Sequence, residues 1–101
     1  MKTVTVGYVV TEPIMDYFIK RRKRFKTLKF TIERPSLGLK TVYAFGEYRS
    51  VVIQANLKRG DRIRIRGEIK NVGISVREIE IIKRYRYKNI DQPQVVFDKW
   101  E

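Results

Sequence analysis

The residues best suited to chemistry in this sequence form a dense block of cations in its first third. Five consecutive cations are followed by Lys26 and Lys29, which makes seven cations and no acid in ten residues. Each cation that contacts a phosphate releases a condensed counterion, so the block is typical of a phosphate-binding loop tip. The alternative is a solvent-exposed hairpin tip whose charges serve only to keep the protein soluble. The density of the block favours phosphate binding. The five consecutive cations are Lys20, Arg21, Arg22, Lys23 and Arg24.

Aromatic side chains beside further cations are candidates for base stacking. They are expected on one face of two neighbouring strands, where exposed rings form a platform for nucleobases worth about 1–3 kcal/mol per stacked base. Alternatively, one or more of the rings belongs to the core, because a one-residue slip in register exchanges the two faces of a strand. The candidate rings are Phe25, Tyr43, Phe45 and Tyr48, and the cations beside them are Lys29 and Lys40.

A ladder of arginines alternates with isoleucines along residues 61–69, DRIRIRGEI. This two-residue period is typical of a half-buried strand, with the isoleucines inward and the arginines outward. The arginines could follow a nucleic-acid backbone or pair with acids of the next strand, and pairing is slightly favoured. The inward residues are Ile63, Ile65 and Ile69; the ladder is Arg62, Arg64 and Arg66; the expected acidic partners are Glu68, Glu78 and Glu80.

A last candidate segment contains Tyr85 and Tyr87 among the cations of residues 83–88. It is either a mixed stacking-and-phosphate segment or an extension of the preceding strand with its rings packed on the end of the fold, and both interpretations stay open.

Composition excludes several classes of function. The 101 residues suit one small domain, and 23 Lys and Arg against 11 Asp and Glu give a net charge of +12, which indicates a polyanionic partner. The chain has no Cys and no His, which removes the thiolate nucleophile, the commonest general base and the commonest transition-metal ligand. No carboxylates have the spacing of a metal or acid–base pair. We therefore expect no enzyme activity, no cofactor and no metal. No apolar run approaches the roughly 20 residues of a membrane span and no signal peptide is visible, so we expect a cytoplasmic protein.

Alternation predicts five strands, at residues 3–10, 25–33, 39–45, 61–70 and 74–84. In the first strand Val4, Val6, Tyr8 and Val10 share one face, with a bend or bulge at Gly7. Residues 11–13, TEP, should break that strand, and residues 14–19 are an irregular continuation of it or a short helix. In the second strand Phe25, Thr27, Lys29 and Thr31 are expected to face opposite to Leu28, Phe30 and Ile32.

Three other segments carry local signals. Residues 58–61, KRGD, form a turn in which Gly60 takes a positive φ. Residues 47–58 carry a possible apolar helical stripe, although their β-branched run lowers helix propensity. In the last strand the apolar parity shifts between Val76 and Ile79, which predicts a bulge near Arg77 and Glu78.

Five strands, one short helix or irregular segment between the third and fourth, and a basic surface predict an all-β OB-fold barrel. In that fold the face of strands 2 and 3 and the loops joining strands 1–2 and 4–5 bind oligonucleotides. Residues 1–85 form the domain. Residues 86–101 form a tail that could add a strand or serve as an interaction segment.

The sequence resembles the OB-fold single-stranded DNA-binding proteins of the bacterial type. The first shared pattern is VGYVVTEPIMDYF, then KRRKR, then FKTLKFTIE. The second is an aromatic–Gly pair at 45–46, an amphipathic segment at 47–57, a Lys-Arg-Gly turn at 58–60 and the strand motif at 64–69. The resemblance covers about residues 4–84. Leu39 stands where the family often has a second aromatic, the loop between strands 2 and 3 is shorter, and the acidic tail motif is absent. The chain would be a compact or divergent member.

This resemblance implies that Phe45 stacks on bases and that the protein binds single-stranded DNA with little sequence preference, in replication, recombination or repair. It also implies a homo-oligomer, a dimer or a tetramer. Two alternatives stay open: an RNA-binding OB-fold protein, and an OB-fold adaptor whose aromatic residues contact other proteins.

Overall fold

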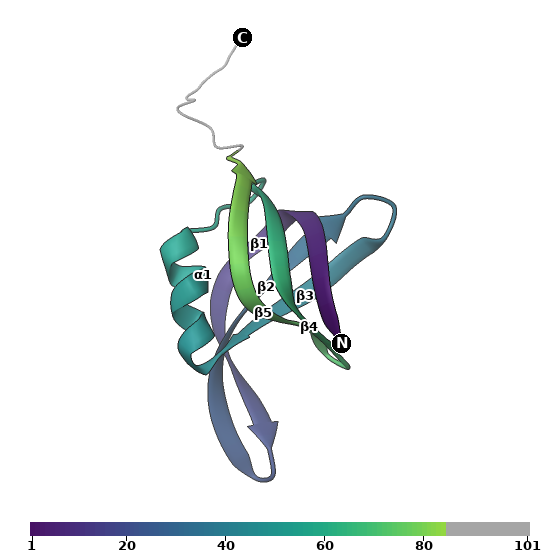
Figure 1. Ribbon diagram of the computed structural model, residues 1–101. Coiled ribbons are helices and arrows are strands. Elements are labelled where there is room, and N and C mark those ends of the chain that lie inside the picture. Colours follow the sequence, from purple (N-terminus) through teal and green to yellow (C-terminus); the bar gives the residue numbers. More distant parts are fainter. Residues whose placement is uncertain (85–101) are drawn as a thin grey trace.

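Five strands and two short helical segments follow one another in the computed structural model, which describes residues 1–84 (Figure 1). The strands close into a barrel in the order β1-β2-β3-β5-β4, with one short helix between β3 and β4, which confirms the predicted OB-fold barrel. The segments are β1 (Lys2–Lys20), β2 (Lys23–Arg34), β3 (Gly38–Phe45), a 3-10 turn (Gly46–Tyr48), α1 (Arg49–Ala55), β4 (Arg62–Lys70) and β5 (Gly73–Lys83).

The long strand β1 pairs with two neighbouring strands in succession. Its first part, residues 2–8, pairs antiparallel with β4, and its later part pairs antiparallel with β2 as far as Lys20. Register shifts between Val9 and Thr11 and between Thr11 and Ile14 let the strand coil from one neighbour to the other. The predicted break at residues 11–13 is therefore an irregularity within one strand. Residues 14–19 continue that strand, which confirms the first of the two predicted alternatives.

The core fills the barrel with alternate residues of the strands and is closed on one side by α1. The predicted inward face of β4 is confirmed at Ile63 and Ile65, alternate apolar residues of β2 and β3 are also buried, and α1 contributes Val52. The fully buried strand residues with less than 2% exposure include Phe30, Ile32, Val42, Ala44, Ile63, Ile65, Ile74 and Val76. The ambiguous segment 47–58 is helical for two turns because Val52 and Leu57 find this core, which outweighs the low propensity of the β-branched run.

The face shared by Val4, Val6, Tyr8 and Val10 of β1 is not the face that enters the core. Val4 is 55% exposed and Tyr8 is 37% exposed, whereas Gly7 and Val9 are buried. Gly7 pairs with Ile63 in regular register, so it is not the bulge. A glycine is needed here because the backbone of β2 approaches closely: a Cβ on residue 7 would lie 2.9 Å from the carbonyl oxygen of Glu33.

The irregularity of β5 lies where the parity shift predicts it. Arg66 pairs with Glu78 and the next residue of β4, Gly67, pairs with Val76, so Arg77 is the extra residue of a bulge. Gly67 has no room for a side chain, because a Cβ there would overlap the carbonyl oxygen of Ser75. One inward prediction fails: Ile69, beyond this point, is 43% exposed.

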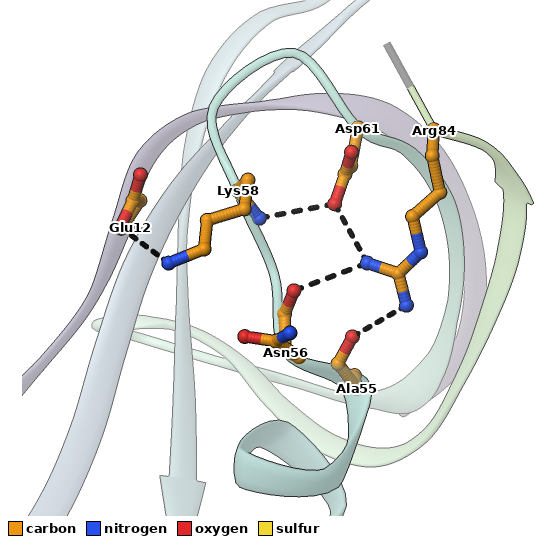
Figure 2. Close-up of polar contacts among 6 residues, drawn as sticks. All are labelled: Glu12, Ala55, Asn56, Lys58, Asp61 and Arg84. Carbon is orange, nitrogen blue, oxygen red and sulfur yellow. Dashed lines mark hydrogen bonds and ion pairs between the residues drawn. The ribbon is translucent and has the colours of Figure 1, made fainter. Parts of the chain in front are cut away.

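The end of β5 is fastened to α1 by Arg84, as Figure 2 shows. Its guanidinium donates to the carbonyl oxygens of Ala55 at 2.7 Å and Asn56 at 3.0 Å, the last carbonyls of the helix, and to Asp61 Oδ2 at 3.0 Å. Asp61 is fully buried and also accepts from the backbone N–H of Lys58 at 3.0 Å. The predicted turn at 58–61 is confirmed, with Gly60 at φ 94°.

Neither helical segment within residues 1–84 is long and apolar enough to cross a membrane. The predicted tail, residues 86–101, lies outside the described residues.

Candidate nucleic-acid interface

The cation block lies on a hairpin that extends beyond the barrel. β1 pairs with β4 only as far as Tyr8, and β2 pairs with β3 only from Thr27 onward. Residues 17–26 therefore pair only with each other, from Tyr17 opposite Lys26 to Lys20 opposite Lys23. We call these ten residues the free hairpin. It projects as a two-stranded ribbon away from the other strands (Figure 1).

The turn of the free hairpin holds two arginines in an unfavourable conformation. Arg21 and Arg22 have φ angles of 51° and 63°. A two-residue hairpin turn with two positive φ angles normally contains Asn-Gly or a similar pair, since only such residues adopt these angles easily. Each non-glycine residue held there costs about 1–3 kcal/mol. The sequence thus places two guanidinium groups at the tip at the expense of stability.

The pairing register sorts the side chains of the free hairpin onto two faces. Opposite residues of an antiparallel pair point to the same side. The first face carries Phe18 opposite Phe25 and Lys20 opposite Lys23. The second face carries Tyr17 opposite Lys26 and Ile19 opposite Arg24, and the Arg24 guanidinium lies 4.0 Å from the centre of the Tyr17 ring. Cations thus occupy both faces and the tip.

An aromatic cluster continues the first face onto the barrel. Phe45 packs edge-on against Phe18, with ring centres 5.4 Å apart, and lies nearly parallel to Tyr43 at 5.9 Å. None of these rings is in the core; Phe45 and Tyr43 are half-buried, and Phe25 is 45% exposed. We call Phe18, Phe25, Tyr43 and Phe45 the aromatic cluster.

Thr27 lies beneath this cluster and is buried, although it was expected on an exposed face. It is the register partner of Phe45, and its hydroxyl donates to the carbonyl oxygen of Ala44 at 2.7 Å. A satisfied hydroxyl can be buried at small cost. Residue type alone therefore mispredicts its exposure, because Thr27 lies between two paired strands, opposite Asp16 and Phe45, with its hydroxyl satisfied.

A cleft runs beside the aromatic cluster, between the hairpin and the turn that joins β4 to β5. Its volume is about 560 Å³. Phe18, Phe25 and Phe45 line one part, and Lys70 and Val72 line the part beside the β4–β5 turn. These are the two loops by which the OB-fold holds oligonucleotides.

One acid lies on the same face as the cluster. Asp16 Oδ2 is 3.1 Å from Lys29 Nζ, and the Asp16 carboxylate accepts from the backbone N–H of Tyr17 at 2.8 Å. The Tyr17 amide and then Lys29 lower the pKa of Asp16 below its ordinary 3.8, and Asp16 raises the pKa of Lys29. At neutral pH the two groups therefore form an ion pair in which Lys29 is partly engaged.

Two predicted site residues lie away from this cluster. Tyr48 lies against Arg77, whose guanidinium is 4.6 Å from the ring centre. Lys40 has the strand parity of Val42 and Ala44, opposite to that of Tyr43, and pairs with Ile32 at the other end of β3. Its expected place beside the stacking platform is therefore wrong.

The arginine ladder is largely engaged in ion pairs with β5, as the favoured alternative predicts. Arg64 lies 2.6 Å from Glu80 and Arg66 lies 3.6 Å from Glu78. Glu68 differs from its predicted role, because it pairs with Lys70 at 3.0 Å and with Arg77 at 3.8 Å, and these cations lower its pKa.

Within residues 1–84 Arg62 has no such acid; its guanidinium lies 5.8 Å from the centre of the Tyr8 ring. Tyr85 and Tyr87 lie outside the described residues.

Sequence reasoning missed Phe18 and Lys70 as members of the site. The signal for Phe18 was present: Ile14, Asp16 and Phe18 alternate once β1 is continued past Pro13, which brings Phe18 opposite Phe25. Lys70 gives no such local signal, although it ends the predicted fourth strand, beside the 4–5 loop that the OB-fold uses for binding.

The comparisons with known proteins support the fold. No family model matches the sequence, and no curated protein matches it. Among solved structures, the chain is similar to the crystal structure of the ZRD-deleted mutant of TiaS in complex with agmatine, with a TM-score of 0.62 and 24% sequence identity. The likeness covers 81% of this chain and 21% of that chain, so this protein spans about a fifth of that chain's length. At this identity the likeness indicates a shared fold alone.

Proposed function

We propose that this protein binds single-stranded nucleic acid, DNA in the first place, with little sequence preference and without enzyme activity. The observation that carries the proposal is the aromatic cluster. Half-exposed rings from β1, β2 and β3 adjoin one another on the barrel face between two loops, at the base of a cationic hairpin. Rings beside cations bind single strands because every base has a π-face and every nucleotide has a phosphate.

The chemistry of the face supports binding without sequence reading. The members of the cluster that line the cleft are three phenylalanines, which offer stacking surface and no hydrogen-bonding group. Lys20 and Lys70 line the same cleft and would contact phosphates, which carry no sequence information. Bases would stack on Phe45 and Phe25, and the backbone would follow the lysines. Such a protein would act where single strands are exposed, in replication, recombination or repair, as a divergent relative of the bacterial single-stranded DNA-binding family.

Titration of fluorescently labelled oligomers tests this proposal. Oligo-dT, oligo-rU and blunt duplex DNA of equal length are compared at two salt concentrations. We expect oligo-dT to bind more tightly than the blunt duplex at both. Equal or tighter binding of the blunt duplex would contradict the proposal. Tighter binding of oligo-rU than of oligo-dT would identify an RNA-binding protein. If no oligomer binds, the remaining candidate is an adaptor that contacts other proteins. Metal-dependent cleavage that a defined active-site variant abolishes would contradict a pure binding module.

A further inference from the structure

The free hairpin carries more cations than a single strand on the aromatic cluster can use. Six of its ten residues are cations, and within residues 1–84 none of the six has an acidic partner. Lys20 and Lys23 lie on the face of the cluster, but Arg24 and Lys26 lie on the opposite face. A strand stacked on Phe45 and Phe25 therefore passes the first face of the ribbon. It reaches the second face only at the edge where Arg24 and Lys26 line a hollow with Phe25 and Phe45.

The length of the hairpin also exceeds what stacking needs. From the level of Phe45, opposite Thr27, four residue pairs lead to Lys20 and Lys23, which is about 14 Å at the rise of a strand. The arginines of the turn lie further out. The charge is thus carried well beyond the rings, on a ribbon only two strands wide.

A ligand that surrounds the ribbon would use both faces and the tip. The major groove of B-form DNA is about 12 Å wide and admits a two-stranded β-ribbon, with a phosphate backbone along each wall. Cations on both faces of a ribbon would meet those two backbones, and the arginines of the turn would enter the groove.

We infer that the preferred ligand is a junction between single-stranded and duplex DNA. The single strand lies on the aromatic cluster and the free hairpin lies in the major groove of the adjoining duplex. The inference rests on the proposed single-strand binding and adds the duplex arm to it. It also assigns DNA over RNA, because the major groove of an A-form duplex is too deep and narrow for side chains to read or a ribbon to enter.

The test compares four labelled ligands at one salt concentration. They are a dT strand of about 16 nucleotides, within the site sizes of OB-folds; the same strand joined to a DNA duplex arm of about 10 base pairs, one helical turn; the same strand joined to an RNA duplex arm; and the DNA arm alone. We expect the DNA junction to bind at least roughly tenfold more tightly than the single strand, the scale that a few extra phosphate contacts supply. The RNA-armed junction should gain far less.

A variant of the second hairpin face separates the two parts of the site. Arg24→Ser with Lys26→Ser should weaken junction binding much more than single-strand binding and so remove most of the junction advantage, because by register these side chains point away from the face of Phe18 and Phe25. Both positions are exposed, so circular dichroism should show an unchanged fold. The matched control is Lys2→Ser with Arg59→Ser, which removes the same charge from exposed positions outside the hairpin and should preserve the advantage.

The outcomes separate this inference from the proposed function. Equal affinity for junction and single strand would overturn the inference alone, as would an advantage that survives in the hairpin variant or is equally large with the RNA arm. Failure of the wild-type protein to bind the single strand would instead overturn the proposed function.

Discussion

At the scale of single residues, stacking and charge should make separable contributions to binding. Phe45 is the centre of the aromatic cluster, since it contacts both Phe18 and Tyr43. Its ring carries no charge and releases no counterion. The lysines of the same cleft release counterions but offer no ring surface. Salt dependence therefore distinguishes the two kinds of contact.

Phe45→Ala should weaken single-strand binding by roughly 1–3 kcal/mol and leave the salt slope nearly unchanged. Fluorescence titration over a range of salt concentrations measures both quantities. Leu39→Ala is the control, because Leu39 is on the same strand and 64% exposed but outside the cluster. If Phe45→Ala melts early yet binds normally when folded, the ring serves the core and the stacking role is refuted.

Asp16→Asn should strengthen binding. The change removes a negative charge from the phosphate-facing surface and releases Lys29, so the slope of log K against log salt should steepen by up to about 0.7 for a single strand. Glu12→Gln is the control, because Glu12 pairs with Lys58 off this face, at 3.6 Å. An unchanged affinity and slope would show that Lys29 does not contact the nucleic acid.

The same ion pair should have a defined pH dependence. The folded protein lowers the pKa of Asp16, so any stability from the pair is present above the ordinary value of 3.8 and is lost as pH falls through the lower folded value. At neutral pH Asp16 is ionised, and the effect of Asp16→Asn on binding should therefore be constant from pH 6 to 8.

At the scale of elements, the hairpin turn exchanges stability for charge. Replacing Arg21-Arg22 by Asn-Gly should raise the free energy of unfolding by about 1 kcal/mol or more, because Asn-Gly suits two positive φ angles. Affinity for the junction should fall, with a salt slope shallower by up to about 0.9 per lost duplex contact. Urea denaturation and titration measure the two effects.

The matched control for the turn is Arg21→Ser with Arg22→Ser. It removes the same charge and keeps non-glycine residues at positive φ, so affinity should fall equally with a much smaller gain in stability. If both variants stabilise the protein equally, the gain in stability comes from relief of charge repulsion and not from relief of the strained backbone of the turn.

The elements also show how far the sequence predicts this molecule. Alternation located β2, β3 and β4, and the parity shift of β5 placed its bulge at Arg77, because inward residues of those strands are apolar. The alternation of Val4, Val6, Tyr8 and Val10 does not mark the inner face of β1, because Gly7 supplies an inward position without an apolar side chain. Phe18 was missed although Ile14, Asp16 and Phe18 alternate, because the register shifts past Val9 that bring it opposite Phe25 are set by tertiary coiling.

At the scale of the whole molecule, Arg84 joins the end of β5 to α1 and to the buried Asp61. Two carbonyls at the helix end and one carboxylate oxygen share a single guanidinium (Figure 2). The Arg84 side chain is 35% exposed, whereas Asp61 is fully buried. Removing the arginine would thus leave a buried carboxylate without this cation.

Arg84→Met should lower the free energy of unfolding by about 1–3 kcal/mol, the cost of leaving buried polar groups without their partner. The methionine keeps much of the apolar stem, so the loss reports the guanidinium. Urea denaturation measures it, with Arg59→Met as the control at an exposed cation of the neighbouring turn.

Combining Arg84→Met with Asp61→Asn in a double-mutant cycle isolates the pair, and we expect a coupling of about 0.5–3 kcal/mol. Additive effects would show that Arg84 acts through the helix carbonyls alone. Single-strand binding by folded Arg84→Met should be unchanged, because the residue lies at the opposite end of β5 from the β4–β5 turn that lines the cleft.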